Sequence, residues 1–213
     1  MDDKKLSRRS FLVSGTILGA GATVAGCASA ETGTTPAQTE GPFYPVAEQA
    51  DKDADLTKVE GRTESASGEV VLVEGRVLGT DGTPLANAVV DVWQANAAGR
   101  YAHEQDPNPA PLDPNFQGWA IITTDAQGRY GFKTVKPGAY PVEDGWARPP
   151  HIHFKVSRRG YKEVTTQMYF EGESLNEVDR ILTALSADQQ KMVVARRSAE
   201  DAPYQFDVVL EKV

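Results

Sequence analysis

The feature that most constrains the fold is a series of short runs rich in β-branched and aromatic residues, each separated from the next by turn-forming residues. The runs cover 69–79, 87–94, 118–124, 129–135, 151–157, 163–170 and 204–213. Such runs predict strands, and the segments "TDGTPLA" and "DAQG" between them predict hairpin turns. Many short strands of this kind are typical of two packed sheets.

Only residues 175–197 show helical spacing, with apolar side chains at 178, 181, 182 and 185. We therefore predict an all-β fold, an antiparallel Greek-key-like β-sandwich of about seven or more strands with one helical insert near the C-terminus. A net charge of −8 argues against nucleic acid as a partner, because phosphate binding needs clustered Lys and Arg. The single cysteine excludes an intrachain disulfide.

Residues 1–26 have the features of an export signal. The segment "SRRSFL", with Arg8 and Arg9, resembles a twin-arginine motif, and an apolar, Gly-rich run follows it. The run ends in "VAGC", which resembles a lipoprotein cleavage site with Cys27 as the lipidated first residue. Two alternatives stay open: the arginines could belong to an ordinary signal for the general export route, and Cys27 could be unmodified.

We accordingly expect export by the twin-arginine route and a periplasmic or cell-surface protein attached to the membrane by a lipid anchor. Residues 27–39 are small and polar and predict a flexible tether. The domain is then expected to cover 40–213, with an ordered extended segment at 40–45 ("EGPFYP") and a surface loop at 46–68. Export in the folded state would suit a metalloprotein, since the ion can be inserted in the cytoplasm.

Two long turn-rich stretches, 95–117 and 136–150, interrupt the strands. Loops of this length inside a compact domain usually have a function. Directly after the second loop comes "HIHFKV", in which strand alternation places His151 and His153 on one face and apolar residues on the other. Two imidazoles in this arrangement can bind one ion.

Other interpretations of the histidine pair remain at this point. The two side chains could be hydrogen-bonded surface residues, or they could form a zinc or iron(II) site with a carboxylate such as Asp125 or Glu143. Tyr101 and Tyr140 lie in the two long loops, where a tyrosine more often packs or donates a hydrogen bond than binds a metal.

From Thr39 to the end, the chain resembles the intradiol ring-cleavage dioxygenases of the protocatechuate 3,4-dioxygenase type. The blocks that carry the resemblance are "EGPFYP" (40–45), "VEGRVLGTDGTPLANAVVDVWQANAAGRY" (73–101), "APLDPNFQG" (110–118), "TTDAQGRYGFKTVKPGAYP" (123–141), "WARPPHIHFKV" (146–156) and "TTQMYFEGE" (165–173). They occur in order and span nearly the whole predicted domain.

The resemblance implies a non-haem iron(III) ion, Fe(3+), held by Tyr101, Tyr140, His151 and His153. Ferric iron is a hard acid that favours phenolate oxygen. The expected reaction is cleavage of a catechol-type ring between its hydroxyls with O2, giving a cis,cis-muconate-type diacid. Arg148 and Gln167 match the family's pair of residues over the substrate ring and are implied to be catalytic.

The remaining expectations concern the surroundings of this site. Trp93 and Trp146 are expected to line the pocket or to pack, and His103 to lie at the surface or pocket edge. The segment between Tyr140 and His151 looks about two residues shorter than in the protocatechuate enzymes, and no motif assigns a ring substituent or an oligomeric state. The rival function is a non-catalytic, transthyretin-like β-sandwich binding module, which has no reason to keep the two tyrosines beside the two histidines.

Overall fold

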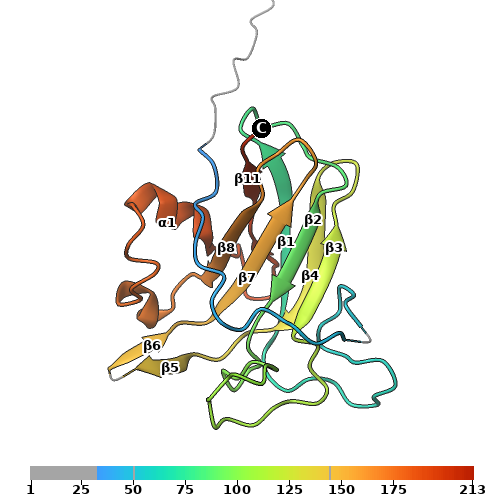
Figure 1. Cartoon of the computed structure of the whole chain (residues 1–213), viewed down its shortest axis with the longest axis vertical. Coiled ribbons are helices and arrows are strands. Elements are labelled where there is room, and N and C mark those ends of the chain that lie inside the picture. Colours follow the sequence, from blue (N-terminus) through green and yellow to red (C-terminus); the bar gives the residue numbers. More distant parts are fainter. Residues whose placement is uncertain (1–32, 50, 144) are drawn as a thin grey trace, which may run out of the picture.

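The computed structural model describes residues 33–49, 51–143 and 145–213 (Figure 1). The predicted signal 1–26 and the predicted lipidation site Cys27 lie outside the described residues. Within those residues, no helix has both the length and the apolar character needed to cross a membrane.

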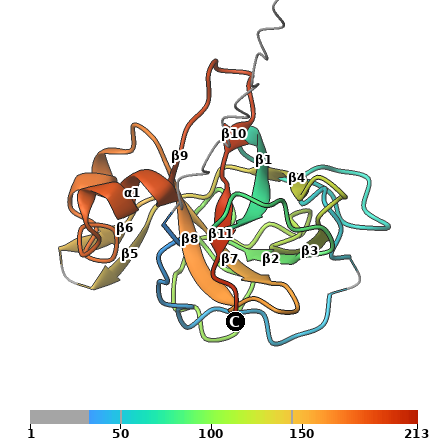
Figure 2. The same ribbon diagram turned by 90° about the horizontal axis from the view of Figure 1, so that it is seen from above.

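The domain is a sandwich of two main sheets, as the strand pattern predicts (Figures 1 and 2). The first sheet contains β1 (Val70–Gly79), β4 (Arg129–Val135), β10 (Tyr204–Gln205) and β11 (Val208–Leu210). The second sheet has the order β3 (Trp119–Thr123), β2 (Val89–Trp93), β7 (His151–Ser157), β8 (Val164–Phe170) and β9 (Val194–Ala195). A separate hairpin joins β5 (Tyr140–Glu143) to β6 (Trp146–Arg148).

The core between the two sheets follows the period-two alternation of the strands. In β7, Ile152, Phe154 and Val156 are completely buried on the inner face. Their neighbours across the sandwich include Val71, Val73, Val77, Phe132, Phe206 and Val208. Leu56 is also fully buried in this core, although residues 46–68 read as a surface loop, because its N–H donates to the Lys133 carbonyl of β4 at 2.8 Å.

Most strand pairs of the sandwich are antiparallel, and three short pairings are parallel, since β10 and β11 run parallel to β1 and β9 runs parallel to β8. The predicted strand 204–213 is also divided in two. At the break, the Asp207 carboxylate accepts the N–H of Arg76 at 2.8 Å in place of a backbone carbonyl. Gly75 makes the break possible, because a Cβ there would lie 1.8 Å from the Phe206 carbonyl oxygen.

The predicted helical insert at 175–197 is much shorter than its apolar spacing suggested. The structure has a 3-10 turn, η1 (Ser174–Glu177), and one short helix, α1 (Ala187–Val193), with turns between them. Asp179 accepts the N–H groups of Ile181 and Leu182 with its side chain, which favours a local turn over a continuous helix. A capping box on Ser186 then begins α1.

The last part of the predicted tether differs from the expectation, because residues 35–39 are bound to the domain. The N–H of Thr35 donates to Val209 in β11, and the N–H of Gln38 donates to Thr165 in β8. We call these residues the strap. They lie along the edge of β8 that faces away from β7, next to the part of that edge that pairs with β9 (Figure 1). Composition favoured flexibility here, but a strand edge with free backbone groups provides hydrogen-bond partners.

Candidate metal centre

Strand β7 presents His151 and His153 on the outer face of the second sheet, as alternation predicts. Both are almost fully buried, with 2% and 3% of their surface exposed, because loops and the strap cover this end of the sheet. Trp93, which pairs with His153 across the sheet, stacks its ring on the imidazole at 4.8 Å and 10°. Trp93 therefore packs against a candidate ligand and restricts its rotation.

Tyr101 is positioned by a turn built around Asn96. The Asn96 side chain accepts the N–H groups of Ala98 and Arg100, and Gly99 has the positive φ of 81° that the turn requires. The Asn96 carbonyl also accepts the N–H of Gly138, which ties the two long loops together. The N–H of Tyr101 then donates to Asp106 at 2.7 Å.

Tyr140 and Arg148 face one another across the β5–β6 hairpin, in which they are register partners. Two prolines then lead from Arg148 into β7. The Pro149 carbonyl lies 2.7 Å from His151 Nδ1, which sets that nitrogen as the protonated one. The lone pair of His151 Nε2 is thereby left for another partner.

All four predicted metal ligands come together in space. The Tyr101 Oη atom lies 3.3 Å from His151 Nε2 and 3.1 Å from His153 Nε2. The Tyr140 ring lies 5.7 Å from the rings of both Tyr101 and His151. Such convergence is expected of a metal site and not of a plain sandwich binding module.

Burial controls the protonation of the cluster. It raises the pKa of both Tyr101 and Tyr140 and lowers the pKa of His151 and of His153, the latter to about 3. The positive charge of Arg148 lowers the pKa of all four groups. At the two phenols it opposes the effect of burial, and at the two imidazoles it adds to that effect. Arg148 thus favours phenolate and neutral imidazole, the forms of these groups that bind a cation.

Arg148 and Gln167 are neighbours in a buried hydrogen-bond network. The Arg148 Nη2 atom donates to Gln167 Oε1 at 2.6 Å and to Tyr169 Oη at 3.2 Å. The Gln167 Nε2 atom donates to the Thr39 carbonyl of the strap at 2.9 Å. The side-chain amide of Gln167 is therefore oriented from both ends.

The sequence did not identify three residues of this network. Tyr169 could have been found, since it lies two residues after Gln167 on the same face of β8 and pairs with His151. Asp179 gave no local signal, because it contacts Arg148 only through the tertiary fold. The strap residue Gln38, whose amide contacts both Gln167 and Tyr169, lay in a segment predicted to be flexible.

The other predicted residues lie around the centre. Trp146 faces Arg148 and Arg180, whose guanidinium carbons lie 6.0 Å and 4.8 Å from its ring. His103 is partly exposed and lies beside Phe43, at a ring distance of 5.8 Å. Phe43 in turn contacts Tyr101, so His103 lies at the edge of the centre.

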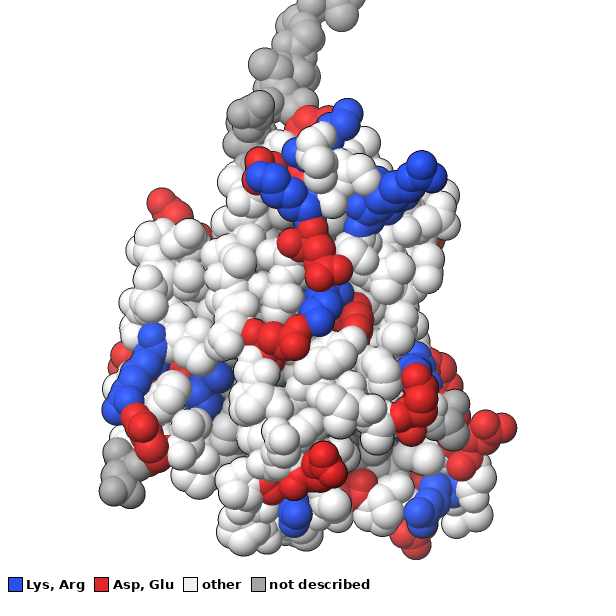
Figure 3. All heavy atoms as spheres, viewed as in Figure 1, with Lys and Arg blue, Asp and Glu red and all other residues white. Residues whose placement is uncertain are grey.

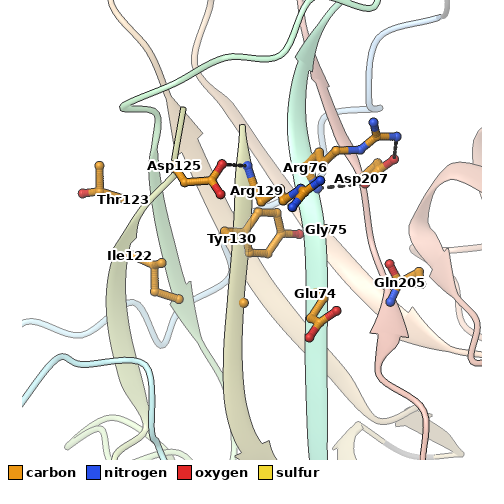
Figure 4. A pocket seen from close by; sticks show the side chains of 11 residues that line it. Glu74, Gly75, Arg76, Ile122, Thr123, Asp125, Arg129, Tyr130, Gln205 and Asp207 are labelled. Atoms are coloured by element: carbon orange, nitrogen blue, oxygen red, sulfur yellow. Dashed lines mark hydrogen bonds and ion pairs between the residues drawn. The ribbon is translucent and has the colours of Figure 1, made fainter. Parts of the chain in front are cut away.

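A carboxylate ligand finds no support among the described residues, where no group of three or more His, Cys, Asp and Glu side chains gathers. Glu143 pairs with Arg180 at the surface. Asp125 comes two residues after Thr123, the last residue of β3. Thr123 pairs with Val89 of β2, and Val89 pairs with Ser157, which lies at the end of β7 opposite His151. Figure 4 shows Asp125 in a separate cleft of about 800 Å³, where its carboxylate accepts the N–H of Arg129.

The fold and the cluster define a β-sandwich that carries a buried site of two tyrosines and two histidines. A family model described as "Dioxygenase" matches residues 39–212. The chain is 42% identical over 179 residues to the protocatechuate 3,4-dioxygenase beta chain of Burkholderia cepacia, which covers 79% of this chain and 76% of the relative. It is 37% identical to catechol 1,2-dioxygenase 2 of Acinetobacter lwoffii, over 66% of this chain and 53% of the relative.

Solved structures of dioxygenases have the same fold as this chain. Catechol 1,2-dioxygenase of Acinetobacter radioresistens superposes with a TM-score of 0.67 at 27% identity, covering 87% of this chain and 66% of that one. The dioxygenase domain of a dioxygenase carbohydrate-binding protein fusion from Streptomyces sp. SirexAA-E has a TM-score of 0.63 at 28% identity, covering 85% and 100%. The chain belongs to the intradiol ring-cleavage dioxygenase family.

Proposed function

We propose that this protein is an Fe(III)-dependent enzyme that cleaves a catechol-type ring between its two hydroxyls, with O2 as the second substrate and a cis,cis-muconate-type diacid as the product. The observation that carries the proposal is the position of Tyr101, whose hydroxyl lies within 3.3 Å of both imidazole Nε2 atoms. Membership of the family supports the reaction class, and the names of the relatives support catechols as the substrate class.

The donor set fits a ferric ion. Tyr101, Tyr140, His151 and His153 would hold it through two phenolate oxygens and two neutral imidazoles, a set whose charge of −2 suits a trivalent hard acid. A ferric ion there would supply Lewis acidity that binds the two catechol oxygens and activates the ring toward O2. Burial keeps both phenols protonated without a cation, so loading is expected to release their two protons.

The chain's own groups have distinct proposed roles. Tyr140 is less buried than Tyr101 and both histidines, and we assign its Oη as the atom that accepts a proton from the incoming catechol. Arg148 would stabilise negative charge that develops on the ring. Gln167 would position the substrate or O2, since its amide is held at both ends. Phe43 and Trp93 pack around Tyr101 and His153 and exclude water.

Reconstitution with ferric iron tests the proposal. The purified full-length chain should become deep red through tyrosinate-to-iron charge transfer, and anaerobic catechol should shift that band. Oxygen uptake with catechol, hydroxyquinol and protocatechuate then assigns the substrate. A chain that takes up one ferric ion and stays colourless, or that is coloured and consumes no oxygen with any of the three, would contradict the proposed function.

We also propose export by the twin-arginine route to the periplasm or cell surface, with a lipid on Cys27. The proposal rests on "SRRSFL" and "VAGC" in the sequence. Mass spectrometry of the membrane-extracted protein is expected to find a diacylglyceryl group on Cys27 as the first residue of the mature chain, and Cys27→Ser should release the protein from the membrane. A mature N-terminus elsewhere than Cys27 would refute the lipid anchor.

A further inference from the structure

Arg148 is held at two of its three guanidinium nitrogens. Its Nε donates to Asp179 Oδ2 at 2.6 Å, and its Nη2 donates to Gln167 and Tyr169. Among the described residues, Nη1 has no hydrogen-bond partner. The guanidinium is planar and rigid, so two fixed nitrogens determine where the third one points.

Asp179 is itself immobile. Its side chain is fully buried, and its second carboxylate oxygen, Oδ1, accepts the N–H groups of Ile181 at 3.1 Å and Leu182 at 2.7 Å. Its carbonyl accepts both the N–H and the hydroxyl of Thr183. One oxygen therefore anchors the carboxylate to the turn before α1, and the other is presented to Arg148.

The charge of Arg148 is also balanced by this contact. Arg148 and Asp179 have 5% and 0% of their side-chain surface exposed, so the pair is shielded from solvent. The cations of the neighbouring elements are paired as well, Arg180 with Glu143 and Lys155 with Glu40. On the face shown in Figure 3, acidic and basic side chains are interspersed over the surface.

We propose that Asp179 is a positioning residue of this site: it holds Arg148 by Nε, so that Nη1 is presented to the substrate ring, and it neutralises the guanidinium before the substrate binds. This inference rests on the proposed function. The consequence for specificity is that the site favours catechols whose ring substituent is uncharged over catechols that carry a carboxylate. A carboxylate on the substrate ring would need an unpaired cation as its partner, and the Arg148 guanidinium is already paired with Asp179.

The test compares the iron-loaded wild-type chain with Asp179→Asn. Asp179 contacts none of the four proposed ligands, so iron content and the charge-transfer band are expected to stay unchanged. We expect kcat with catechol to fall about 10- to 100-fold, the scale on which partners of site residues act. The ratio of kcat/KM for protocatechuate to kcat/KM for catechol should rise about tenfold, because removing the carboxylate leaves one net positive charge beside the substrate.

A role in folding alone would lower both kcat/KM values together and leave their ratio unchanged, so an unchanged ratio overturns the proposal. Glu143→Gln is the matched control, since it removes a carboxylate from the exposed pair with Arg180; the ratio should then stay within about twofold.

If Asp179→Asn does not fold, Asp179→Glu replaces it. That variant keeps the charge and moves the carboxylate, so kcat should fall while the ratio stays near the wild-type value, and an unchanged kcat would contradict the role.

A second readout does not depend on turnover. In the metal-free wild-type protein, the Nε–H of Arg148 should give a nitrogen-15 NMR signal that is protected from solvent exchange, because that proton is buried against Asp179. A rapidly exchanging signal overturns the positioning role, whatever the activity. A wild-type protein that shows the protected signal but has no ring-cleaving activity would instead contradict the proposed function and leave the Arg148–Asp179 contact confirmed.

Discussion

Replacement of Tyr101 by phenylalanine is expected to abolish the red colour and the ring-cleaving activity and to lower iron affinity by at least about 100-fold. The hydroxyl that this change removes is the atom on which both imidazole Nε2 atoms converge. The phenyl ring keeps the packing against Phe43 and Tyr140, so the aromatic cluster should remain folded. Iron per chain, visible absorbance and oxygen uptake measure the three effects, and circular dichroism measures the fold.

The matched control is Tyr161→Phe, because Tyr161 packs near Gly79 and pairs with Lys212 at the other end of the sandwich. That variant should keep the colour and activity of the wild-type protein. Tyr140→Phe should also lose activity, but with the weaker effect on iron binding, since Tyr140 is more exposed than Tyr101. Retention of full colour by Tyr101→Phe would show that Tyr101 is not a ligand.

Replacement of Arg148 by lysine is expected to lower kcat about 10²- to 10³-fold while iron stays bound, the scale of losing one preorganised donor at a developing charge. Lysine keeps the positive charge, but its three N–H donors lie on a single nitrogen, which cannot reproduce the planar fork that contacts Asp179 and Gln167 from two separate nitrogens and presents a third to the substrate. Steady-state kinetics with catechol, together with iron content and the charge-transfer band, measure this effect.

Arg148→Met adds a stability readout, because it leaves the fully buried Asp179 without its partner. The free energy of unfolding of the metal-free protein should then fall by about 3–5 kcal/mol, as found when one partner of a buried ion pair is removed. Arg180→Met removes the exposed partner of Glu143 and should cost less than about 1 kcal/mol. Urea denaturation measures both, and equal losses for the two variants would argue against a buried, tightly held pair.

Strand alternation was enough to place several parts of the site. The strand pattern predicted β7 with the bounds that the structure shows, and alternation put both histidines on the face opposite Ile152 and Phe154. It could not bring in Tyr101, because the position of that side chain depends on Asn96, whose carbonyl reaches Gly138 in the other long loop. The resemblance to a family supplied the tyrosines, and the structure then showed that they converge with the histidines.

The local pattern failed in two segments, for different reasons. The helical spacing of 175–197 marked residues that dock on the domain, such as Leu182. The backbone N–H groups of Ile181 and Leu182 donate to the Asp179 carboxylate, and these hydrogen bonds divide the segment into turns. The composition of 27–39 favoured a flexible tether, yet its end pairs with the exposed edge of β8. The first error therefore comes from local side-chain hydrogen bonds, and the second from backbone hydrogen bonds to strands far along the chain; neither composition nor apolar spacing records such bonds.

The amino-acid sequence by itself therefore determined strands β1 to β4, β7 and β8 and the pair of histidines that point away from the core, because these follow from side-chain periodicity within one segment. Only the tertiary structure decided how Arg148 is held, because Asp179 lies 31 positions farther along the chain, in a turn within a segment whose spacing predicted a helix. It likewise decided that the strap orients Gln167, a contact between residues 128 positions apart. Contacts of that separation depend on how the sheets, loops and strap pack together, and no local pattern records that packing.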